Sequence, residues 1–299
     1  MTTDLDGVTA VLITAYREGT AQVDEDTVTA IAARAAAAGV PVLTALGNTA
    51  EVQQLGPDER LAVLRAVAAV DQPVTRIAGV CGGMPTMLSE IETARELGYH
   101  AAMVHEPADP FGDPDSLTSF YRQLAQTSAL PTVLYLRSTR LQPTHLAELA
   151  ALPAVVGVKY ARNDLHTLAT LLAGPAGEQC TWINGLAESA VASFGALGVT
   201  SFTSGIANAR PDIALAVHRA VTDGDLGQLR DLVRDFVEPV EALRAEHGGR
   251  YNVATIKQLL RWQGIEAGGV RPPHAELDED ARSRLGVVRS TATTAGSPR

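Results

Sequence analysis

Eight short apolar runs alternate with longer helical segments along most of the chain. Each run is rich in small and β-branched residues, which is typical of a strand buried on both faces of a parallel sheet. The runs are Val8–Thr14, Val40–Leu46, Val74–Gly79, Ala101–His105, Thr132–Leu136, Val155–Lys159, Thr181–Asn184 and Val199–Thr203. A strand–helix unit repeated eight times predicts a (β/α)8 TIM barrel of the α/β class. An open doubly wound sheet is the main alternative, but no Gly-x-Gly-x-x-Gly motif follows the first run.

Helix-start signals stand ahead of several segments between the runs. Acidic and hydroxyl side chains accept hydrogen bonds from the first free N–H groups of a helix, and proline fits its first turn. The signals are Asp24, Pro57-Asp58-Glu59, Asp115-Ser116 and Asp164. They support helices between the predicted strands.

The part of the chain after the eighth unit predicts additional helices. We assign residues 1–223 to the barrel and 224–290 to a C-terminal helical extension, with helices over Leu226–His247 and Val253–Gln263. Residues 291–299 are polar and small, which predicts a disordered tail.

Charge and composition exclude several function classes. The 299 residues carry a formal net charge of −10, which argues against nucleic acid and anionic membranes as partners. The sequence has no apolar run of membrane-spanning length and no basic N-terminal targeting region, so we expect a soluble, cytoplasmic protein. Cys81 and Cys180 are expected to be buried free thiols. No His, Cys, Asp or Glu residues have the spacing of metal ligands, so we expect no metal site.

One strand ends in a lysine, and lysine is rare in this chain. Only Lys159 and Lys257 are lysines among the 24 basic residues; the others are arginines. Arginine stays protonated at any working pH, whereas a desolvated lysine amine loses its proton and can attack a carbonyl carbon. Lys159, at the end of Val155–Lys159, is therefore a candidate Schiff-base nucleophile, with a solvent-reaching lysine as the alternative.

Polar residues follow other predicted strands at the same end of the barrel, where active sites of this fold lie. The candidates for catalysis or substrate binding are Gly47, Asn48, Thr49, Tyr135, Arg137, Arg140, Gly185, Ser204 and Gly205. The backbone N–H groups of the Gly47–Thr49 turn are suited to a carboxylate. One of the two arginines is suited to a distal carboxylate, and Arg140 is the more easily explained as a solvated loop charge. His105 is expected to be a hydrogen-bonded structural histidine.

The ordered combination of these residues resembles the dihydrodipicolinate synthase / N-acetylneuraminate lyase family. The likeness spans 7–277 and is carried by Gly47-Asn48-Thr49-Ala50-Glu51, Tyr135, Gly157-Val158-Lys159, Gly198, Ser204-Gly205, Asn208, Pro211, Lys257, Gly264 and Arg271-Pro272-Pro273. The resemblance implies a barrel, usually a homotetramer, that needs no cofactor beyond the imine its lysine forms with pyruvate or another 2-keto acid. Lys159 then forms the imine, Tyr135 moves protons, and Asn48 and Thr49 bind the substrate carboxylate.

Departures from the family pattern favour its sugar-acid branch, which includes the keto-deoxyglucarate dehydratases. Members that make the lysine precursor usually carry Gly-Thr-Thr-Gly-Glu, where this chain has Asn48 and Ala50. Their tyrosine pair after the fourth strand is absent from Glu106–Phe111, and their Tyr-Asn has become Tyr135-Leu136. The resemblance therefore implies an aldolase or dehydratase acting on a 2-keto acid or keto-deoxy sugar acid. The alternatives are 4-hydroxy-tetrahydrodipicolinate synthase, using pyruvate and aspartate semialdehyde, and a non-catalytic keto-acid-binding paralogue.

Overall fold

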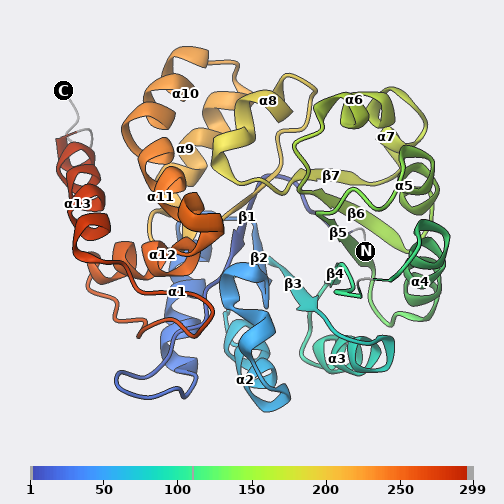
Figure 1. The fold of residues 1–299 in the computed structure, drawn as a ribbon, viewed down its shortest axis with the longest axis horizontal. Coiled ribbons are helices and arrows are strands. Elements are labelled where there is room, and N and C mark those ends of the chain that lie inside the picture. The colour runs from blue at the N-terminus through green and yellow to red at the C-terminus, as the bar shows by residue number, and fades with distance from the viewer. Residues whose placement is uncertain (1–2, 110, 295–299) are drawn as a thin grey trace.

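The computed structural model describes residues 3–109 and 111–294, with side chains described as far as residue 286. Eight parallel strands close into a barrel in chain order, and β1 pairs with β8 (Figure 1). The strands are β1 (Val8–Val11), β2 (Val42–Ala45), β3 (Thr75–Val80), β4 (Ala101–His105), β5 (Thr132–Leu136), β6 (Val155–Tyr160), β7 (Thr181–Asn184) and β8 (Phe202–Ser204). This architecture confirms the predicted (β/α)8 barrel and excludes the open sheet.

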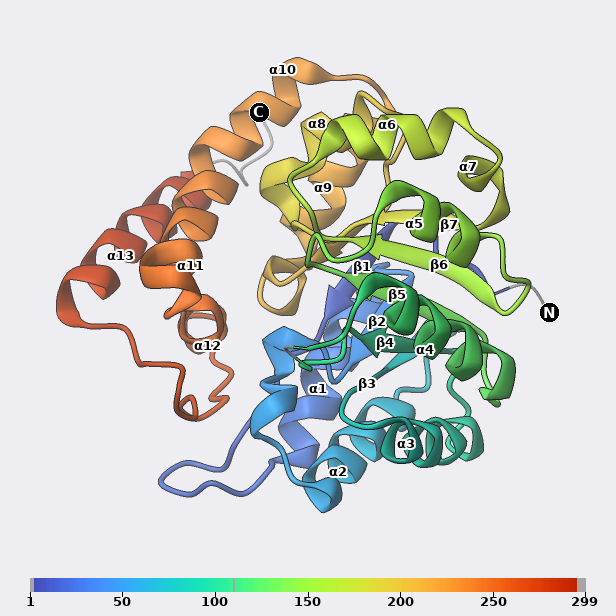
Figure 2. The ribbon, with the colours of Figure 1, turned by 45° about the vertical axis from the view of Figure 1, so that its right-hand side comes forward.

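Helices surround the barrel, and a further group of helices lies on one side of it (Figure 2). The surrounding helices are α1 (Glu25–Ala37), α2 (Pro57–Ala68), α3 (Met84–Glu96), α4 (Pro114–Thr127), α5 (Pro143–Ala150), α6 (Leu165–Ala173), α7 (Ala176–Gln179), α8 (Val191–Gly195) and α9 (Pro211–Thr222). The further group is α10 (Leu226–Leu232), α11 (Glu238–Gly249), α12 (Asn252–Arg261) and α13 (Glu279–Thr294). Of this group, α12 contacts the short 3₁₀ helices Asn48–Ala50 and Ile206–Asn208, which follow β2 and β8.

Most of the predicted helix starts are confirmed. Asp24 accepts a hydrogen bond from the Thr27 N–H, and Asp164 accepts one from the Thr167 N–H. The predicted start of α4 at Asp115 was two residues too late. Asp113 is the N-cap and accepts hydrogen bonds from the N–H groups of Asp115 and Ser116. Asp113-Pro114 combines a capping carboxylate with a proline in the first turn, so the helix begins at Pro114.

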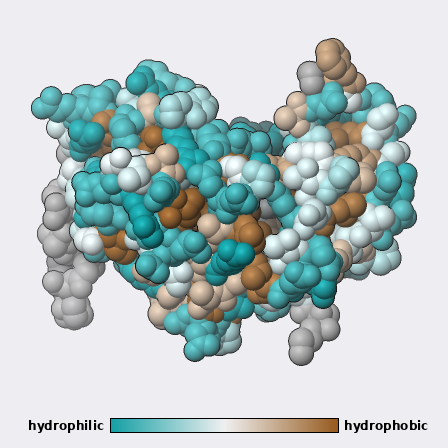
Figure 3. Space-filling view, turned by 90° about the horizontal axis from the view of Figure 1, so that it is seen from below, coloured by the Kyte–Doolittle hydropathy of each residue, from teal (hydrophilic) through white to brown (hydrophobic). Residues whose placement is uncertain are grey.

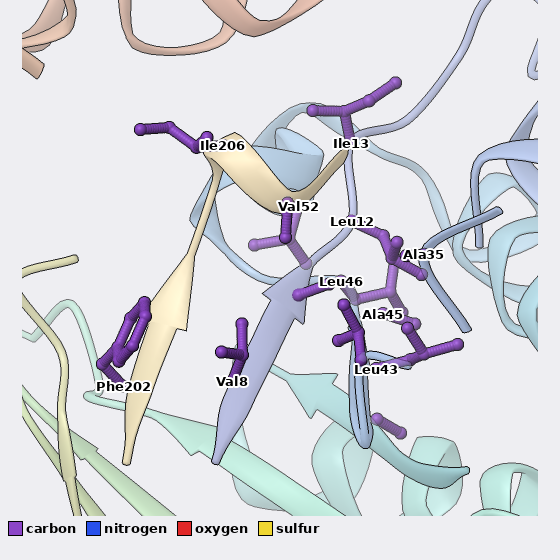
Figure 4. Close-up of a cluster of buried hydrophobic side chains, with 14 of the residues drawn as sticks. Val8, Leu12, Ile13, Ala35, Leu43, Ala45, Leu46, Val52, Phe202 and Ile206 are labelled. Carbon is purple, nitrogen blue, oxygen red and sulfur yellow. The ribbon is translucent and has the colours of Figure 1, made fainter. Parts of the chain in front are cut away.

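The apolar side chains form two cores. A small cluster fills the barrel interior, with Leu5, Val42, Ile77, Met103, Val133 and Ile183 among its members. A much larger cluster fills the layer between strands and helices, and Figure 4 shows Val8 of β1, Phe202 of β8 and Ala35 of α1 within it. This division is the one that a barrel requires, because its strands are buried on both faces.

The helical extension differs from the prediction in two places. The expected single helix Leu226–His247 contains a π-helical turn at Val233–Val237. Pro239 has no N–H to donate to the preceding turn, which explains a local change of hydrogen-bonding register there. The sequence analysis also missed α13, which begins after Asp278 and buries Ala281 and Leu285, spaced one turn apart.

Because α13 continues to Thr294, residues 291–294 are helical rather than part of a disordered tail. Residues 295–299 of the predicted tail lie outside the described residues. Both cysteines are free thiols, and Cys81 is buried as expected, but Cys180 is only partly buried because it lies in the connection between α7 and β7.

Within residues 3–109 and 111–294, no helix is both long enough and apolar enough to cross a bilayer. The face drawn in Figure 3 is mainly hydrophilic, with hydrophobic residues in small separate patches.

A tight turn after β2 positions the loop that follows it. Leu46 has a φ of 57°, a left-handed conformation that is uncommon for a residue with a side chain. Its carbonyl group points towards β3, where Gly79 leaves room for it: a Cβ at Gly79 would lie 2.7 Å from the Leu46 carbonyl carbon and overlap the oxygen. Gly79 is therefore required by the Leu46 carbonyl rather than by its own backbone conformation.

We predict that Gly79→Ala destabilises the protein by about 3 kcal/mol or prevents folding, because backbone and not a flexible side chain must move. Gly83→Ala is the matched control, since Gly83 has a φ of −77° and its added Cβ would come no closer than 3.9 Å to Pro85. Urea unfolding of both variants tests this. Equal stability of the two would contradict the account of the Leu46 turn.

Candidate active site

A cavity of about 460 Å³ opens at the carboxyl ends of the barrel strands. Seven of the predicted site residues line it: Asn48, Thr49, Tyr135, Arg137, Lys159, Gly185 and Gly205. They come from β5 and β6 and from the segments that follow β2, β5, β7 and β8. The closed sheet therefore brings these distant segments to one place, as parallel strands in a barrel must.

Strand register places three of the site's side chains in one row. His105 of β4 pairs with Tyr135 of β5, and Tyr135 pairs with Lys159 of β6. The Lys159 Nζ lies 4.0 Å from the centre of the Tyr135 ring, and the rings of Tyr135 and His105 meet edge to face at 5.3 Å. The pairing of β4, β5 and β6 thus determines which side chain adjoins the amine.

The amine of Lys159 is almost completely removed from water. The residue is 5% exposed, and burial lowers the pKa of its amine from 10.5 to about 7, with a smaller contribution from the positive charge of Arg137. Gly185 makes room for the side chain, because a Cβ there would lie 3.0 Å from the Lys159 Cγ and 2.8 Å from the Ala161 Cβ. Near neutral pH a large fraction of the amine is therefore neutral and nucleophilic.

The phenol of Tyr135 contacts the loop after β2 as well as the lysine. The Nδ2 of Asn48 donates a hydrogen bond of 3.1 Å to the Tyr135 hydroxyl oxygen. Burial raises the pKa of Tyr135, so the phenol keeps its proton at neutral pH. Because its oxygen accepts from Asn48, its own O–H remains available to donate to a bound molecule.

His105 has the structural role that the sequence analysis expected. Its Nε2 lies 3.0 Å from the Leu46 carbonyl oxygen, and because a carbonyl only accepts, Nε2 is the protonated nitrogen. Burial lowers the pKa of His105 to about 4, so the ring is neutral at physiological pH. His105 therefore helps to hold the Leu46 turn that leads into Gly47, Asn48 and Thr49.

Gly47 and Ser204 do not line the cavity. Gly47 is buried against the Val11 side chain, which its missing Cβ would overlap. The Ser204 hydroxyl donates to the carboxyl group of buried Glu188 and accepts from the Ala207 N–H at 2.8 Å. Both residues therefore shape the loops that border the site, and neither presents a free group to it.

The two candidate arginines have separate positions. Arg137 lines the cavity and is exposed, and among the described residues no carboxylate pairs with its guanidinium. Arg140 faces a different cavity, of about 530 Å³, and is held by the carboxylate of Glu106 and the carbonyl oxygens of Pro107 and Asp109. Arg140, which was predicted to bind substrate, thus lies away from the cavity that Lys159 faces, and its guanidinium is occupied in closing the loop after β4.

One wall of the cavity was missed altogether. Glu241, Arg244, Gly248, Gly249, Asn252, Pro273 and His274 line it, and all belong to the chain after the barrel. Nothing in their spacing indicated this, because the extension reaches the site through tertiary contacts such as that of Arg244 with Gly205, which follows β8. Across the described residues, no group of three or more His, Cys, Asp or Glu side chains is arranged to hold a metal ion.

The pKa of Lys159 has a consequence for stability. Folded Lys159 loses its proton near pH 7, whereas an unfolded lysine does so near 10.5, so between these values the unfolded chain binds more protons. The stability of the folded state therefore rises with pH over this interval. At pH 7, burial of the Lys159 amine therefore lowers the stability of the folded state, whereas burial of a neutral side chain of similar size does not.

We predict that Lys159→Met raises the free energy of unfolding by roughly 1–4 kcal/mol at pH 7, with the gain vanishing towards pH 10.5. Lys257→Met is the control: it removes the cation that lies 3.4 Å from the buried Glu51 carboxylate and should destabilise the protein. Denaturant unfolding at several pH values measures both. A Lys159→Met variant less stable than the wild type at pH 7 would contradict the desolvation argument.

Comparison with known proteins identifies relatives of this barrel. A sequence model of the dihydrodipicolinate synthetase family matches residues 4–291. A probable 5-dehydro-4-deoxyglucarate dehydratase 1 of Streptomyces coelicolor is 31% identical over 262 residues, covering 84% of this chain and 82% of the relative. A probable 5-dehydro-4-deoxyglucarate dehydratase of Saccharopolyspora erythraea is 30% identical, covering 86% and 84%.

Solved structures show the same fold. Dihydrodipicolinate synthase from Oceanobacillus iheyensis superposes with a TM-score of 0.92 at 28% identity, covering 96% of each chain. A sialic acid aldolase of Ruminococcus gnavus superposes at 0.86 with 18% identity, covering 97% of this chain and 99% of the aldolase, a likeness of fold alone. With the family match across nearly its whole length, the chain belongs to the dihydrodipicolinate synthetase family of lyases.

Proposed function

We propose that the protein is a dehydratase or aldolase that forms an imine between Lys159 and a keto-deoxy sugar acid. The observation that carries the proposal is the environment of Lys159: a buried amine with a pKa of about 7, facing a cavity and adjoining the Tyr135 ring. A neutral amine in such a site attacks a ketone without an external cofactor. The dehydratase relatives supply the substrate class.

The carboxylate of the keto acid binds next to the Asn48–Ala50 helical turn. The first N–H groups of a helix have no partner within it, so they are suited to an anion. Asn48 and Thr49 line the cavity at this turn. A carboxylate there places the neighbouring ketone within the same cavity as Lys159.

Imine formation joins the Lys159 nitrogen to the ketone carbon and releases the ketone oxygen as water. Tyr135 donates and accepts the protons that this exchange requires. The cationic imine then accepts the electron pair released when a proton leaves the adjacent carbon, which forms an enamine. Loss of the hydroxyl one carbon further along then completes a dehydration. In aldol cleavage no proton leaves the adjacent carbon: the imine instead accepts the electron pair of the bond between these two carbons, while the hydroxyl loses its proton and its carbon becomes a carbonyl.

Arg137 binds the far end of a substrate that has a second carboxylate. Its guanidinium faces the cavity without a carboxylate partner among the described residues, and guanidinium binds carboxylates through two parallel hydrogen bonds. A diacid therefore fits this site better than a monoacid of the same length.

Borohydride reduction in the presence of pyruvate tests the imine. We expect one stable adduct on the peptide that contains Lys159, none in Lys159→Arg, and an adduct rate that rises with pH through about 7 as the amine becomes neutral. An adduct on Lys257, or none with any 2-keto acid, would disprove the assignment.

Tyr135→Phe separates binding from proton transfer. The phenyl ring keeps the packing beside Lys159 but loses the hydroxyl, so turnover of 5-dehydro-4-deoxyglucarate should fall by about two to four orders of magnitude. Slow adduct formation with pyruvate should remain. Imine formation without turnover of any sugar acid by the wild type would instead support a keto-acid-binding protein without catalysis.

A further inference from the structure

The wall of the cavity supplied by the helical extension contains a buried ion pair that the proposed chemistry does not use. Glu241 and Arg244 lie one turn apart on α11, and both line the cavity. Their side chains are 14% and 7% exposed, respectively. A buried ion pair costs desolvation and is weak support for stability by itself, so its position at the cavity calls for another explanation.

Arg244 is held in one orientation. Its Nε donates to the Asn252 carbonyl oxygen at 3.2 Å and its Nη2 to the Asn252 Oδ1 at 2.7 Å, while Nη1 pairs with Glu241. The guanidinium also lies directly on Gly205, after β8: a Cβ on Gly205 would be 2.6 Å from Nη2 and 2.8 Å from Cζ. The absence of a side chain at Gly205 therefore creates the space in which Arg244 reaches the cavity.

The pair still has hydrogen-bonding capacity. A guanidinium has five N–H donors, and these contacts use three of them, one each from Nε, Nη1 and Nη2. On Glu241, Oε1 accepts from Arg244, which leaves Oε2 as an acceptor. The charges of the two side chains offset each other, so the pair presents a donor and an acceptor side by side without net charge.

The protonation of Glu188, a second carboxyl group near the Glu241–Arg244 pair, also affects the local charge. It is fully buried, and its carboxyl group accepts from Ser204. Burial, and then the negative charge of Glu241, raise the pKa of Glu188 to about 8, so it is mainly neutral at pH 7. Among the described residues Glu241 is the carboxylate that forms an ion pair with Arg244, and the positive charge of Arg244 has only a smaller, opposing effect on the pKa of Glu188.

We infer that the Glu241–Arg244 pair binds the hydroxyl groups of the substrate's carbon chain and thereby selects a polyhydroxylated keto acid over pyruvate. A hydroxyl both donates and accepts, so it matches a neutral donor–acceptor pair, whereas a carboxylate matches the unpaired guanidinium of Arg137. This inference rests on the proposed function, and it assigns part of the substrate specificity to the helices outside the barrel.

The test compares two ligands in one assay. For each ligand it measures the concentration that gives half of the maximal amount of borohydride-reduced adduct. Pyruvate has no hydroxyl-bearing chain and reports on Lys159 and the carboxylate site, whereas 5-dehydro-4-deoxyglucarate also reaches the pair. In Arg244→Gln, the value for pyruvate should stay within about twofold of wild type, and that for the sugar acid should rise about 10- to 100-fold. Arg234→Gln is the matched control, because Arg234 is an exposed arginine ten residues before Arg244 that pairs with Asp231 and Asp235.

Equal weakening of both ligands in Arg244→Gln, or no change in either, would overturn the inference while leaving the imine chemistry intact. Absence of an adduct in the wild type would instead disprove the proposed function on which it rests. Glu241→Ala provides a second variant should Arg244→Gln fold poorly. It removes the acceptor and should weaken the sugar acid selectively in the same assay, and an unselective effect would again contradict the inference.

Discussion

Removal of the Lys159 amine from water, in a place that a small molecule can still reach, is the constraint on which the site depends. The pairing of β5 with β6 puts the Tyr135 ring against Nζ, and Gly185 leaves the side chain a path beside Ala161. These contacts cost stability, because a lysine amine is better solvated in water. The same desolvation gives a nucleophile near neutral pH, so the cost and the reactivity have one cause.

The loop after β2 is held from two directions. From the barrel, His105 donates to the Leu46 carbonyl oxygen, which fits only because β3 has glycine at position 79. From the extension, Lys257 and the Arg271 N–H contact the buried Glu51 carboxylate. The segment that carries Asn48 and Thr49 is therefore fixed between the barrel and the C-terminal helices. Together with the cavity wall formed by Glu241 and Arg244, this makes the extension part of the site and not an addition to a finished barrel.

Local sequence patterns predicted the features that depend on one strand or one turn. Eight apolar runs were enough for the barrel, and the barrel in turn collected Asn48, Tyr135 and Lys159 at one end. Features that depend on tertiary contacts could not be predicted in the same way. Spacing could not show that Arg140 is occupied by Glu106, while the guanidinium of Arg137 has no carboxylate partner within the described part of the chain. It also could not show that Arg244, 39 residues after Gly205, lies on that glycine.

The protonation of Lys159 can be measured directly because the chain has only two lysines. Labelling with lysine that carries ¹³C at Cε gives two resonances, and Lys159→Arg assigns them. We predict a resonance of Lys159 that titrates near pH 7, clearly below the 10.5 of an ordinary lysine, and that shifts when pyruvate is added. A Lys159 resonance that titrates near 10.5 and does not respond to pyruvate would contradict the account of this site.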